Sequence, residues 1–486
     1  MGKIIGREHE KALLERNLSS KEAEFIAVYG RRRVGKTYLV SEFCKGKGLY
    51  FEATGQSNAK KSIQLENFSI ALAQVFYHGI EIAPPYTWPE AFRMLKDAIL
   101  KTKSKRKVIL FIDEAPWFAF KNSGFLSALE YFWNTWASRQ KNIKLIACGS
   151  ASSWMLRNIV NSKEGLHNRI TATIRLLPFT LSETKMFLEY RGVKLNDRQI
   201  LDIYMVMGGI PYYLRHLQKG MSSVQNINHL CFCKDGVLVD EFNKLYDSLF
   251  TNSANYKTIV TALAKSRKGL PRKDLAKKLA VKTGGTINRI LENLREAGFI
   301  APFPSYGKKK RGARYRLIDE YSYFYLHWIR GLDSSILNDP RSQYWQTMSG
   351  SQRWKSWSGY TFETVCFKHV RFIKVALGIS GVITKEASWQ YIPEKGDRSE
   401  KGAQIDLLLD RNDNVISICE IKCHSSEFSI DKKYAQELKN KIGVFREKTT
   451  TNKSIFLVMV TVEGVKANSY STEIVNNEVT LKDFFV

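Results

Sequence analysis

Near its start the chain reads Val28-Tyr29-Gly30-Arg31-Arg32-Arg33-Val34-Gly35-Lys36-Thr37, which contains the complete pattern G-x-x-x-x-G-K-T. The apolar run Phe25 to Tyr29 before the pattern predicts a buried strand, and the segment Thr37 to Phe43 after it is compatible with a helix. A strand, a glycine-containing turn and a helix in this order form a phosphate-binding loop. The sequence therefore predicts an α/β fold with a nucleotide site at the turn, rather than a turn that binds nothing.

Each position of this loop has a chemical role. Glycines let backbone N–H groups turn inward around phosphate oxygens, and the helix N-terminus adds the positive end of its dipole. Lys36 can reach the β- and γ-phosphates, and Thr37 can ligate Mg²⁺. We expect the nucleotide to be bound by Gly30, Arg31, Arg32, Arg33, Val34, Gly35, Lys36 and Thr37.

A second apolar run, Lys107 to Ile112, ends in Asp113-Glu114 and predicts another strand of the same sheet. Asp113 would hold Mg²⁺ directly or through water, as a ligand together with Thr37. Glu114 would orient and deprotonate the attacking water. An acidic turn after a strand is common, but its pairing with the phosphate-binding loop favours the catalytic interpretation.

Two further polar residues are candidates for the same site. The apolar run Lys144 to Cys148 predicts a third strand that ends in Gly149-Ser150. In ATPases with a strand inserted between the two nucleotide motifs, a small polar residue here senses the γ-phosphate. Ser150 is the candidate for this role, and an ordinary solvated strand end is the alternative. Arg169 is a candidate arginine finger, although a surface or packing role is favoured because nothing local fixes its direction.

The composition limits the class of protein. Of 486 residues, 44% are hydrophobic and 25% charged, as in a soluble globular protein, and the length predicts two to four domains. The net charge of +28 indicates a polyanionic partner. Seven scattered cysteines predict buried thiols without a disulfide framework or a four-ligand zinc site. The polar N-terminus and the lack of a long apolar run predict a cytoplasmic protein with no membrane partner.

Five motifs occur in order along the first half of the chain: Gly6-Arg7-Glu8, the loop Gly30 to Thr37, Ile112 to Trp117, Gly149-Ser150, and Gly208 to Leu214. Together they resemble the archaeal-type ATPase family within the AAA+/STAND group of P-loop NTPases. The resemblance implies ATP and Mg²⁺ as cofactors. It also implies a helical lid that closes over the nucleotide and touches it through Pro211. By themselves, residues 208–211 predict only a helix break.

Beyond a connecting helical segment at 221–254, the pattern predicts a winged helix-turn-helix. Helices are expected at 256–265, 271–280 and 286–297, strands at 299–303 and 313–317, and a basic wing tip at 306–312. Residues 256–316 hold 17 Lys and Arg against 3 Asp and Glu, which favours contact with DNA phosphates. The alternative is a module that transmits the nucleotide state to a protein partner, as winged helices of STAND-type ATPases do.

A second constellation lies near the C-terminus. Strands are predicted at 405–409 and 415–422, joined by a turn at 411–414. Because side chains alternate along a strand, Glu420 and Lys422 share a face, and Asp406 on the neighbouring antiparallel strand can reach the same point. Asp406 and Glu420 would bind a divalent metal, with Lys422 beside the attacking water. Metal-assisted phosphodiester hydrolysis requires this arrangement.

Helices are predicted on either side of this strand pair, at 361–365 and 431–446. The ordered set resembles the PD-(D/E)XK restriction-endonuclease-like fold. The resemblance implies a catalytic core of Asp406, Glu420 and Lys422, with Glu363 as the acidic position on the first helix. Gln404 departs from the pattern, because relatives often have an acid there. A hairpin with a surface charge pair, or a domain that binds without cutting, is the alternative.

The sequence thus predicts an α/β chain with three parts. They are a P-loop ATPase domain with a parallel sheet and helical lid at 1–220, a helical connector and winged helix at 221–345, and an α/β nuclease-like domain at 346–486, with a hinge at 339–356. The favoured function is ATP hydrolysis coupled to DNA binding, with Mg²⁺-dependent DNA cleavage left open. The alternative is a nucleotide-gated switch that binds a protein partner. A homo-oligomer is also left open.

Overall fold

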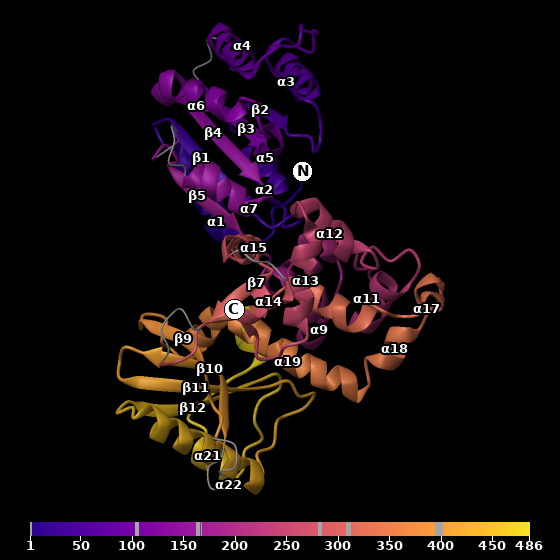
Figure 1. Cartoon of the computed structure of the whole chain (residues 1–486), viewed down its shortest axis with the longest axis vertical. Helices are drawn as coiled ribbons and strands as arrows, with labels where there is room; N and C mark the ends of the chain where they lie inside the picture. Colours follow the sequence, from indigo (N-terminus) through magenta and orange to yellow (C-terminus); the bar gives the residue numbers. More distant parts are fainter. Residues whose placement is uncertain are drawn as a thin grey trace. The chain divides into compact units, whose positions relative to one another are not determined.

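The computed structural model describes residues 2–102, 106–161, 166, 168–279, 284–307, 313–393 and 402–486 (Figure 1). They form two compact units. The first comprises Met1–Pro178 with Glu292–Gly298, and the second comprises Phe179–Leu291 with Phe299–Val486. Within the described residues, no helix is long and apolar enough to cross a membrane. All seven cysteines are free thiols, and six of them are buried.

The first unit contains a parallel sheet with the strand order β2-β3-β4-β1-β5. Its strands are β1 (Glu24–Gly30), β2 (Leu49–Thr54), β3 (Val108–Asp113), β4 (Ile143–Gly149) and β5 (Ala172–Leu176). Strand β4 lies between β1 and β3, as predicted for a strand inserted between the two nucleotide motifs. The predicted α/β class is confirmed.

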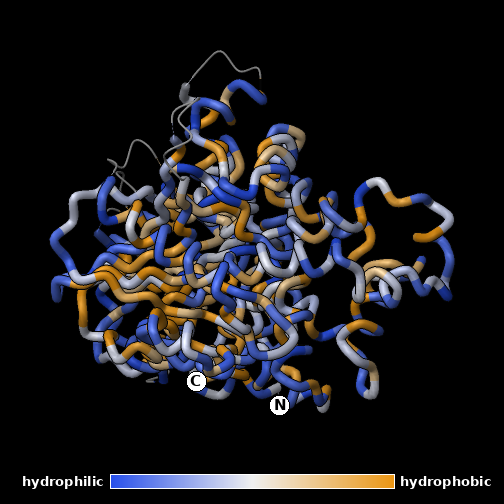
Figure 2. Tube along the Cα trace, turned by 90° about the horizontal axis from the view of Figure 1, so that it is seen from below, coloured by the Kyte–Doolittle hydropathy of each residue, from blue (hydrophilic) through white to orange (hydrophobic). Residues whose placement is uncertain are grey.

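Helices cover the sheet of the first unit. They are α1 (Glu8–Ser19), α2 (Lys36–Cys44), α3 (Lys61–Phe76), α4 (Trp88–Lys101), α5 (Ala115–Phe118), α6 (Phe125–Thr135) and α7 (Ser152–Met155). Strands β3 and β4 are buried at every position, which explains their unbroken apolar sequence. Figure 2 draws the trace from below, and orange hydrophobic stretches are most evident there in layered extended segments.

The second unit begins with a group of helices: α8 (Leu181–Tyr190), α9 (Asp197–Met207), α10 (Pro211–Leu214), α11 (Ser223–Phe232) and α12 (Glu241–Leu249). Helices α8 and α9 both start with capping boxes. The break between α9 and α10 needs its glycines. Gly208 has a φ of 61°, and a Cβ on Gly209 would lie 1.9 Å from the carbonyl oxygen of Phe179.

Three helices and a small antiparallel sheet follow. The elements are α13 (Ser253–Ala264), β6 (Leu270–Pro271), α14 (Arg272–Lys278), α15 (Gly284–Glu296), β7 (Ile300–Phe303) and β8 (Arg314–Leu317), with strand order β6-β8-β7. These bounds lie within a few residues of the predicted ones. The apolar face predicted for α15 is buried through Ile287, Ile290, Leu291 and Leu294. The basic wing tip at Lys308 to Arg311 lies outside the described residues.

An aromatic cluster joins the helices that follow: α16 (Glu320–Phe324), η4 (Tyr325–Ile329), α17 (Ser334–Asn338), α18 (Tyr344–Met348), α19 (Gln352–Lys368) and α20 (Val370–Ala376). Trp345 is fully buried, stacked on Phe232 of α11 and edge-on to Trp328. The hinge predicted at 339–356 is therefore wrong, because this segment forms α18 and buries a tryptophan in the core.

The C-terminal sheet has the order β13-β12-β11-β10-β9. Its strands are β9 (Thr384–Tyr391), β10 (Ala403–Arg411), β11 (Val415–Lys422), β12 (Ser454–Thr461) and β13 (Asn477–Val479), with helices α21 (Lys432–Thr449) and α22 (Ser469–Ile474) nearby. Strands β9, β10 and β11 pair antiparallel, whereas β11, β12 and β13 pair parallel. Because Leu407 pairs with Cys419, Asp406 lies across from Glu420.

Candidate functional sites

The loop between β1 and α2 depends on two glycines for different reasons. A Cβ on Gly30 would lie 2.2 Å from the carbonyl oxygen of Leu176 on β5. Gly35 has a φ of 89°, and its missing Cβ faces open space. The first glycine therefore permits close packing of strands, and the second permits a left-handed turn into the helix. Among the loop's other residues, Arg31 and Val34 are buried, Arg33 is half-buried and Arg32 is exposed.

Lys36 and Thr37 each contact a residue predicted for the same site. The Nζ atom of the buried Lys36 donates hydrogen bonds to the backbone oxygen of Arg31 at 3.0 Å and to Oγ of Ser150 at 2.8 Å. The Oγ1 atom of Thr37 donates one to Oδ2 of Asp113 at 2.8 Å. The ends of β1, β3 and β4 thus bring three separate sequence motifs together.

Glu114 is held by Ser150 through two hydrogen bonds. The backbone N–H of Ser150 donates to Oε2 at 3.1 Å, and its hydroxyl donates to Oε1 at 2.5 Å. Because the same hydroxyl accepts from Lys36, Ser150 links the candidate phosphate ligand to the candidate base. Glu114 has a φ of 47°, a left-handed backbone conformation that is uncommon for a non-glycine residue.

Asp113 is suited to a cation. Burial raises its pKa, against the hydrogen bond from Thr37, which lowers it. Its Oδ1 atom is buried and has no nitrogen or oxygen partner among the described residues. Two oxygen ligands beside each other fit Mg²⁺, which takes most of its other ligands from phosphates and water. No group of three or more His, Cys, Asp or Glu side chains in the described part of the chain could hold a metal ion by itself.

Arg7 contributes to this site in a way the sequence did not reveal. Its side chain is 5% exposed, and Nη2 donates to the backbone oxygen of Val34 at 3.3 Å. Arg7 therefore supports the phosphate-binding loop from the N-terminal segment, which gives the Gly6-Arg7-Glu8 motif a physical reason. Arg169 is exposed. Pro211 starts α10 in the second unit, so its role as a lid contact stays a prediction.

The second candidate site lies at the ends of β10 and β11. Oε1 of Glu420 accepts hydrogen bonds from the Tyr434 hydroxyl at 2.6 Å and lies 3.1 Å from Nζ of Lys422. Its Oε2 accepts from Nζ of Lys441 at 2.5 Å. Burial raises the pKa of Glu420, but the two lysines and the hydrogen bonds outweigh it, so the pKa is lowered overall. Tyr434 and Lys441, both on α21, were missed by the sequence reasoning.

Two further carboxylates belong to this neighbourhood. Asp406 accepts a hydrogen bond at 2.6 Å from Gln404, the residue that departs from the nuclease pattern. Glu363 on α19 is half-buried, and its partial burial together with the nearby Asp406 raises its pKa to about 8, with Arg316 opposing the rise. The residues predicted for this site, Glu363, Asp406, Glu420 and Lys422, thus lie close enough to influence one another electrostatically.

The β7–β8 hairpin packs directly against this part of the second unit. Phe303 of β7 stacks on Phe367 of α19, with ring centroids 3.8 Å apart. The backbone just after β7 also pairs with β9, because the N–H of Tyr306 donates to the backbone oxygen of Ser388 at 2.8 Å. Arg316 of β8 lies over the Phe303 ring and acts on the pKa of Glu363. The hairpin therefore borders the carboxylate cluster.

Comparisons with known proteins find similarity mainly to ATPases. Residues 5–217 match the model of a family described as an ATPase domain predominantly from Archaea. Over 438 residues the chain is 25% identical to an uncharacterized protein of Methanocaldococcus jannaschii, covering 86% of this chain and 87% of that protein. A 46-residue stretch is 44% identical to an uncharacterized ATP-binding protein of the same organism, covering 10% of this chain and 78% of that protein.

Two solved structures are similar in part. One is a Walker-type ATPase of Pyrococcus abyssi, with a TM-score of 0.48 and 19% identity, covering 66% of this chain and 96% of that chain. The other is the ORC2 protein of Aeropyrum pernix, with a TM-score of 0.43 and 15% identity, covering 67% of this chain and 93% of that chain.

Proposed function

We propose that this chain, whose residues 5–217 match the model of an ATPase domain predominantly from Archaea, couples ATP hydrolysis in its first unit to DNA binding by its second. The observation that carries the proposal is the linked set of contacts from Lys36 through Ser150 to Glu114. This set connects a phosphate ligand to a base, which is what hydrolysis of a phosphoanhydride needs.

The roles at the first site follow from the contacts. Lys36 binds the β- and γ-phosphates, and Glu114 positions and deprotonates the attacking water. Ser150 orients both side chains. Thr37 and Asp113 would hold Mg²⁺, which would neutralise charge on the phosphates. Pro211 is proposed as the lid contact.

DNA binding is proposed for the segment from α13 to β8 as a winged helix. Two observations support this proposal. Residues 256–316 contain 17 basic and 3 acidic residues, and three helices are followed by a hairpin, as in a winged helix. Arg289 is exposed on α15, on the face opposite its buried leucines and isoleucines, and the exposed Asn288 beside it accepts a hydrogen bond from Nε of Arg272 at 2.6 Å. This face is the proposed contact with DNA.

DNA cleavage is the finer part of the proposal. Its support is the group of Glu363, Asp406, Glu420 and Lys422, bordered by the hairpin of the proposed DNA-binding module. Asp406 and Glu420 would hold a divalent metal, and Lys422 would stabilise charge that develops on the scissile phosphate.

One observation favours a second candidate function, a nucleotide-gated switch with a non-cleaving nuclease-like domain. Both oxygens of Glu420 are engaged by lysines, and Gln404 supplies a neutral amide to Asp406. A metal ion would have to compete with these contacts. In this version a protein partner, rather than DNA, responds to the nucleotide state.

One experiment separates the two functions. The full chain is incubated with supercoiled plasmid, Mg²⁺ or Mn²⁺ and ATP, and phosphate release and nicking are measured together. We expect Lys36→Ala to abolish phosphate release and Asp406→Asn to abolish only nicking. Phosphate release without nicking under any metal or nucleotide condition would reject cleavage and, if duplex DNA is not bound either, leave the switch.

DNA contact has its own test. Arg289→Ala in the full chain should weaken binding to duplex DNA and reduce the log–log salt slope by roughly one unit, because one phosphate contact is lost. The exposed Lys234, on the helical part of the second unit, provides the control. Equal effects of Arg289→Ala and Lys234→Ala would reject the α15 interface.

A further inference from the structure

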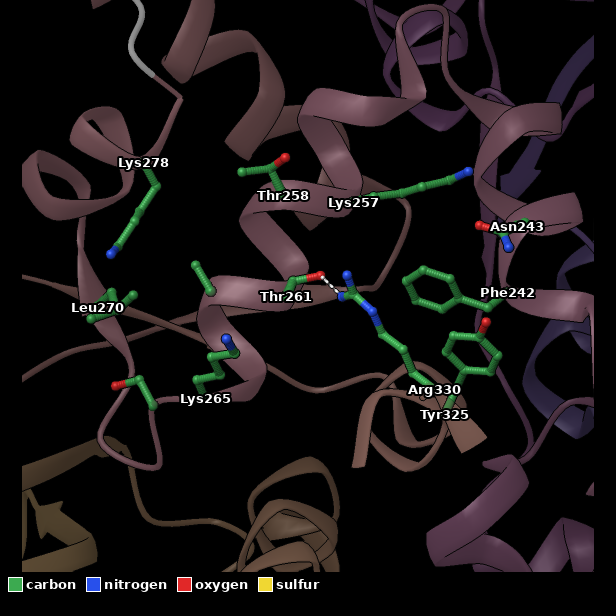
Figure 3. A pocket seen from close by; sticks show the side chains of 12 residues that line it. Phe242, Asn243, Lys257, Thr258, Thr261, Lys265, Leu270, Lys278, Tyr325 and Arg330 are labelled. Carbon is green, nitrogen blue, oxygen red and sulfur yellow. Dashed lines mark hydrogen bonds between the residues drawn. The ribbon is translucent and has the colours of Figure 1, made fainter. Parts of the chain in front are cut away.

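A cavity of about 750 Å³ opens in the second unit between α12, α13, the β6–α14 segment and η4 (Figure 3). It shares no lining residue with the two sites described above. Its volume falls within the range of about 300–1,000 Å³ that is typical of small-molecule sites. The cavity is therefore large enough for a ligand of its own.

The charged side chains that line the cavity are all positive. Its cationic lining residues are Lys257, Lys265, Lys278 and Arg330, and none of the described residues that line it is Asp or Glu. Lys257 pairs with Asp247 at 2.8 Å, outside the lining. The other three cations make no ion pair with a carboxylate in the described part of the chain. A ligand with several negative charges would compensate them.

Figure 3 shows how these cations are presented. Arg330 extends from the end of η4 across to α13, where Nη1 donates to Oγ1 of Thr261 at 3.0 Å. This hydrogen bond holds the guanidinium at the cavity and leaves its other N–H groups available for an anion. Lys265 and Lys278 reach the same space from α13 and α14.

One side of the cavity is lined by aromatic and aliphatic side chains. The rings of Phe242 and Tyr325 stack with centroids 4.5 Å apart and planes inclined by 2°. Leu270 and Ala262 extend the apolar lining, and Asn243 adds an amide with both donors and an acceptor. Because Phe242 is buried, a planar heterocycle can pack only on the half-buried ring of Tyr325, while its ring nitrogens bond to the amide.

We propose that this cavity binds a nucleoside phosphate, either free in solution or at the end of a single nucleic-acid strand. Lys265, Lys278 and Arg330 bind the phosphates, and the base packs against the half-buried Tyr325, whose ring is stacked on the buried Phe242. The site is additional to the phosphate-binding loop and does not depend on ATP hydrolysis. A ligand here would contact α13 and α14, two of the helices of the proposed DNA-binding module.

The test uses the full chain with Lys36→Ala, which disables the first nucleotide site. Calorimetry at physiological salt measures binding of ATP, AMP, adenosine and single-stranded oligonucleotides with and without a 5′-phosphate. We expect one equivalent of a phosphorylated ligand to bind and adenosine to bind at least tenfold more weakly. Preference for ATP or AMP over the 5′-phosphorylated strand identifies a free nucleotide as the source, and the reverse preference identifies a strand end.

Matched variants locate the site. Adding Arg330→Ala or Lys265→Ala to the Lys36→Ala chain should weaken binding at least tenfold, whereas Lys277→Ala, next to Lys278 but outside the cavity, should not. ATP hydrolysis by Arg330→Ala in the otherwise unchanged chain controls for folding. The proposal is overturned if no phosphorylated ligand binds the Lys36→Ala chain, or if Arg330→Ala and Lys277→Ala weaken binding equally.

Discussion

Ser150 donates two hydrogen bonds to the carboxylate of Glu114, from its backbone N–H at 3.1 Å and from its hydroxyl at 2.5 Å. The hydroxyl also accepts a hydrogen bond from Lys36. The side chain of Ser150, just after β4, therefore orients both the ammonium group of Lys36 and the carboxylate of Glu114. The sequence predicts that Ser150 senses the γ-phosphate, and its contacts indicate a second role, which is to position Glu114.

Ser150→Ala should lower kcat for ATP hydrolysis by about tenfold to a hundredfold, because a hydrogen bond to a charged group is worth about 1.5–3 kcal/mol. KM should change little, since Lys36 keeps its contact with Arg31. Steady-state phosphate release measures both. Ser150→Thr, which keeps the hydroxyl, should recover most of the rate. A wild-type kcat in Ser150→Ala would show that Ser150 is only a strand end.

Thr37→Val should raise the Mg²⁺ concentration needed for half-maximal hydrolysis. The variant removes the hydroxyl that lies beside Asp113, and with it one of the two protein oxygens proposed for the metal. A Mg²⁺ titration of phosphate release measures the shift, with Thr37→Ser as the control that keeps the oxygen. An unchanged Mg²⁺ requirement would remove Thr37 from the metal site.

Lys422→Ala and Lys441→Ala should differ, although both lysines contact Glu420. Loss of Lys422 should reduce nicking by about a hundredfold or more, as removal of one charge-stabilising donor does elsewhere. Loss of Lys441 should leave nicking within a few-fold and tighten metal binding, because a competing cation is gone. Metal calorimetry and plasmid nicking on the full chain distinguish them. Equal effects would mean that Lys422 only neutralises Glu420.

The stability of the second unit should depend on pH through His369. Its Nε2 accepts from the backbone N–H of Leu181 at 3.2 Å, and Nδ1 lies 2.8 Å from the backbone oxygen of Val365. Burial, with Lys368 and Arg371 adding to it, lowers the pKa of His369 to about 3. Between this value and the ordinary pKa of about 6.5, only the unfolded chain binds the proton.

The contribution of His369 to the free energy of unfolding is therefore fully present above the pKa of the histidine in the unfolded chain. It is lost as the pH falls toward 3, by up to about 1.4 kcal/mol per pH unit. His369→Gln can keep the hydrogen bond from Leu181 without titrating. When the pH is lowered from 7.5 to 5, the Tm of the wild-type chain should decrease more than the Tm of His369→Gln. Parallel pH profiles would exclude His369 as the source.

Gly209→Ala should destabilise the second unit by about 1–3 kcal/mol or more, as overpacking of buried positions does. The added Cβ would meet the backbone of Phe179, which cannot move aside as a side chain can. Gly443 on α21 has open space around it and gives the control. Gly443→Ala should raise stability by about 0.5–1 kcal/mol. Thermal unfolding compares the two, and equal Tm values would contradict the packing argument.

Motifs in which chemistry and local structure coincide could be predicted from sequence. The strand, turn and helix around Lys36 are contiguous, and the period of two along β11 places Glu420 and Lys422 on one face. Contacts that depend on how distant elements pack could not be predicted. Lys441 reaches Glu420 from α21, and Arg7 reaches the loop from the N-terminal segment. No local pattern encodes either approach.

The same reason explains the failed hinge. Residues 339–356 are polar and contain a proline, which favours a flexible loop. The segment is nevertheless ordered, because Trp345 stacks on Phe232 of α11. In addition, the backbone N–H of Trp345 donates to Oδ1 of Asn228 at 2.9 Å. Tertiary packing of one large aromatic residue thus determines the structure of the segment.

Single-turnover hydrolysis by Glu114→Gln tests the central claim most directly. The variant keeps the size of the side chain and removes the base. We predict that Glu114→Gln binds ATP as tightly as the wild-type chain but hydrolyses it about a hundredfold to ten-thousandfold more slowly, the range that base catalysis contributes. Hydrolysis at the wild-type rate would contradict the assignment of Glu114 as the catalytic base and, with it, the proposed chain of contacts from Lys36 through Ser150 to that base.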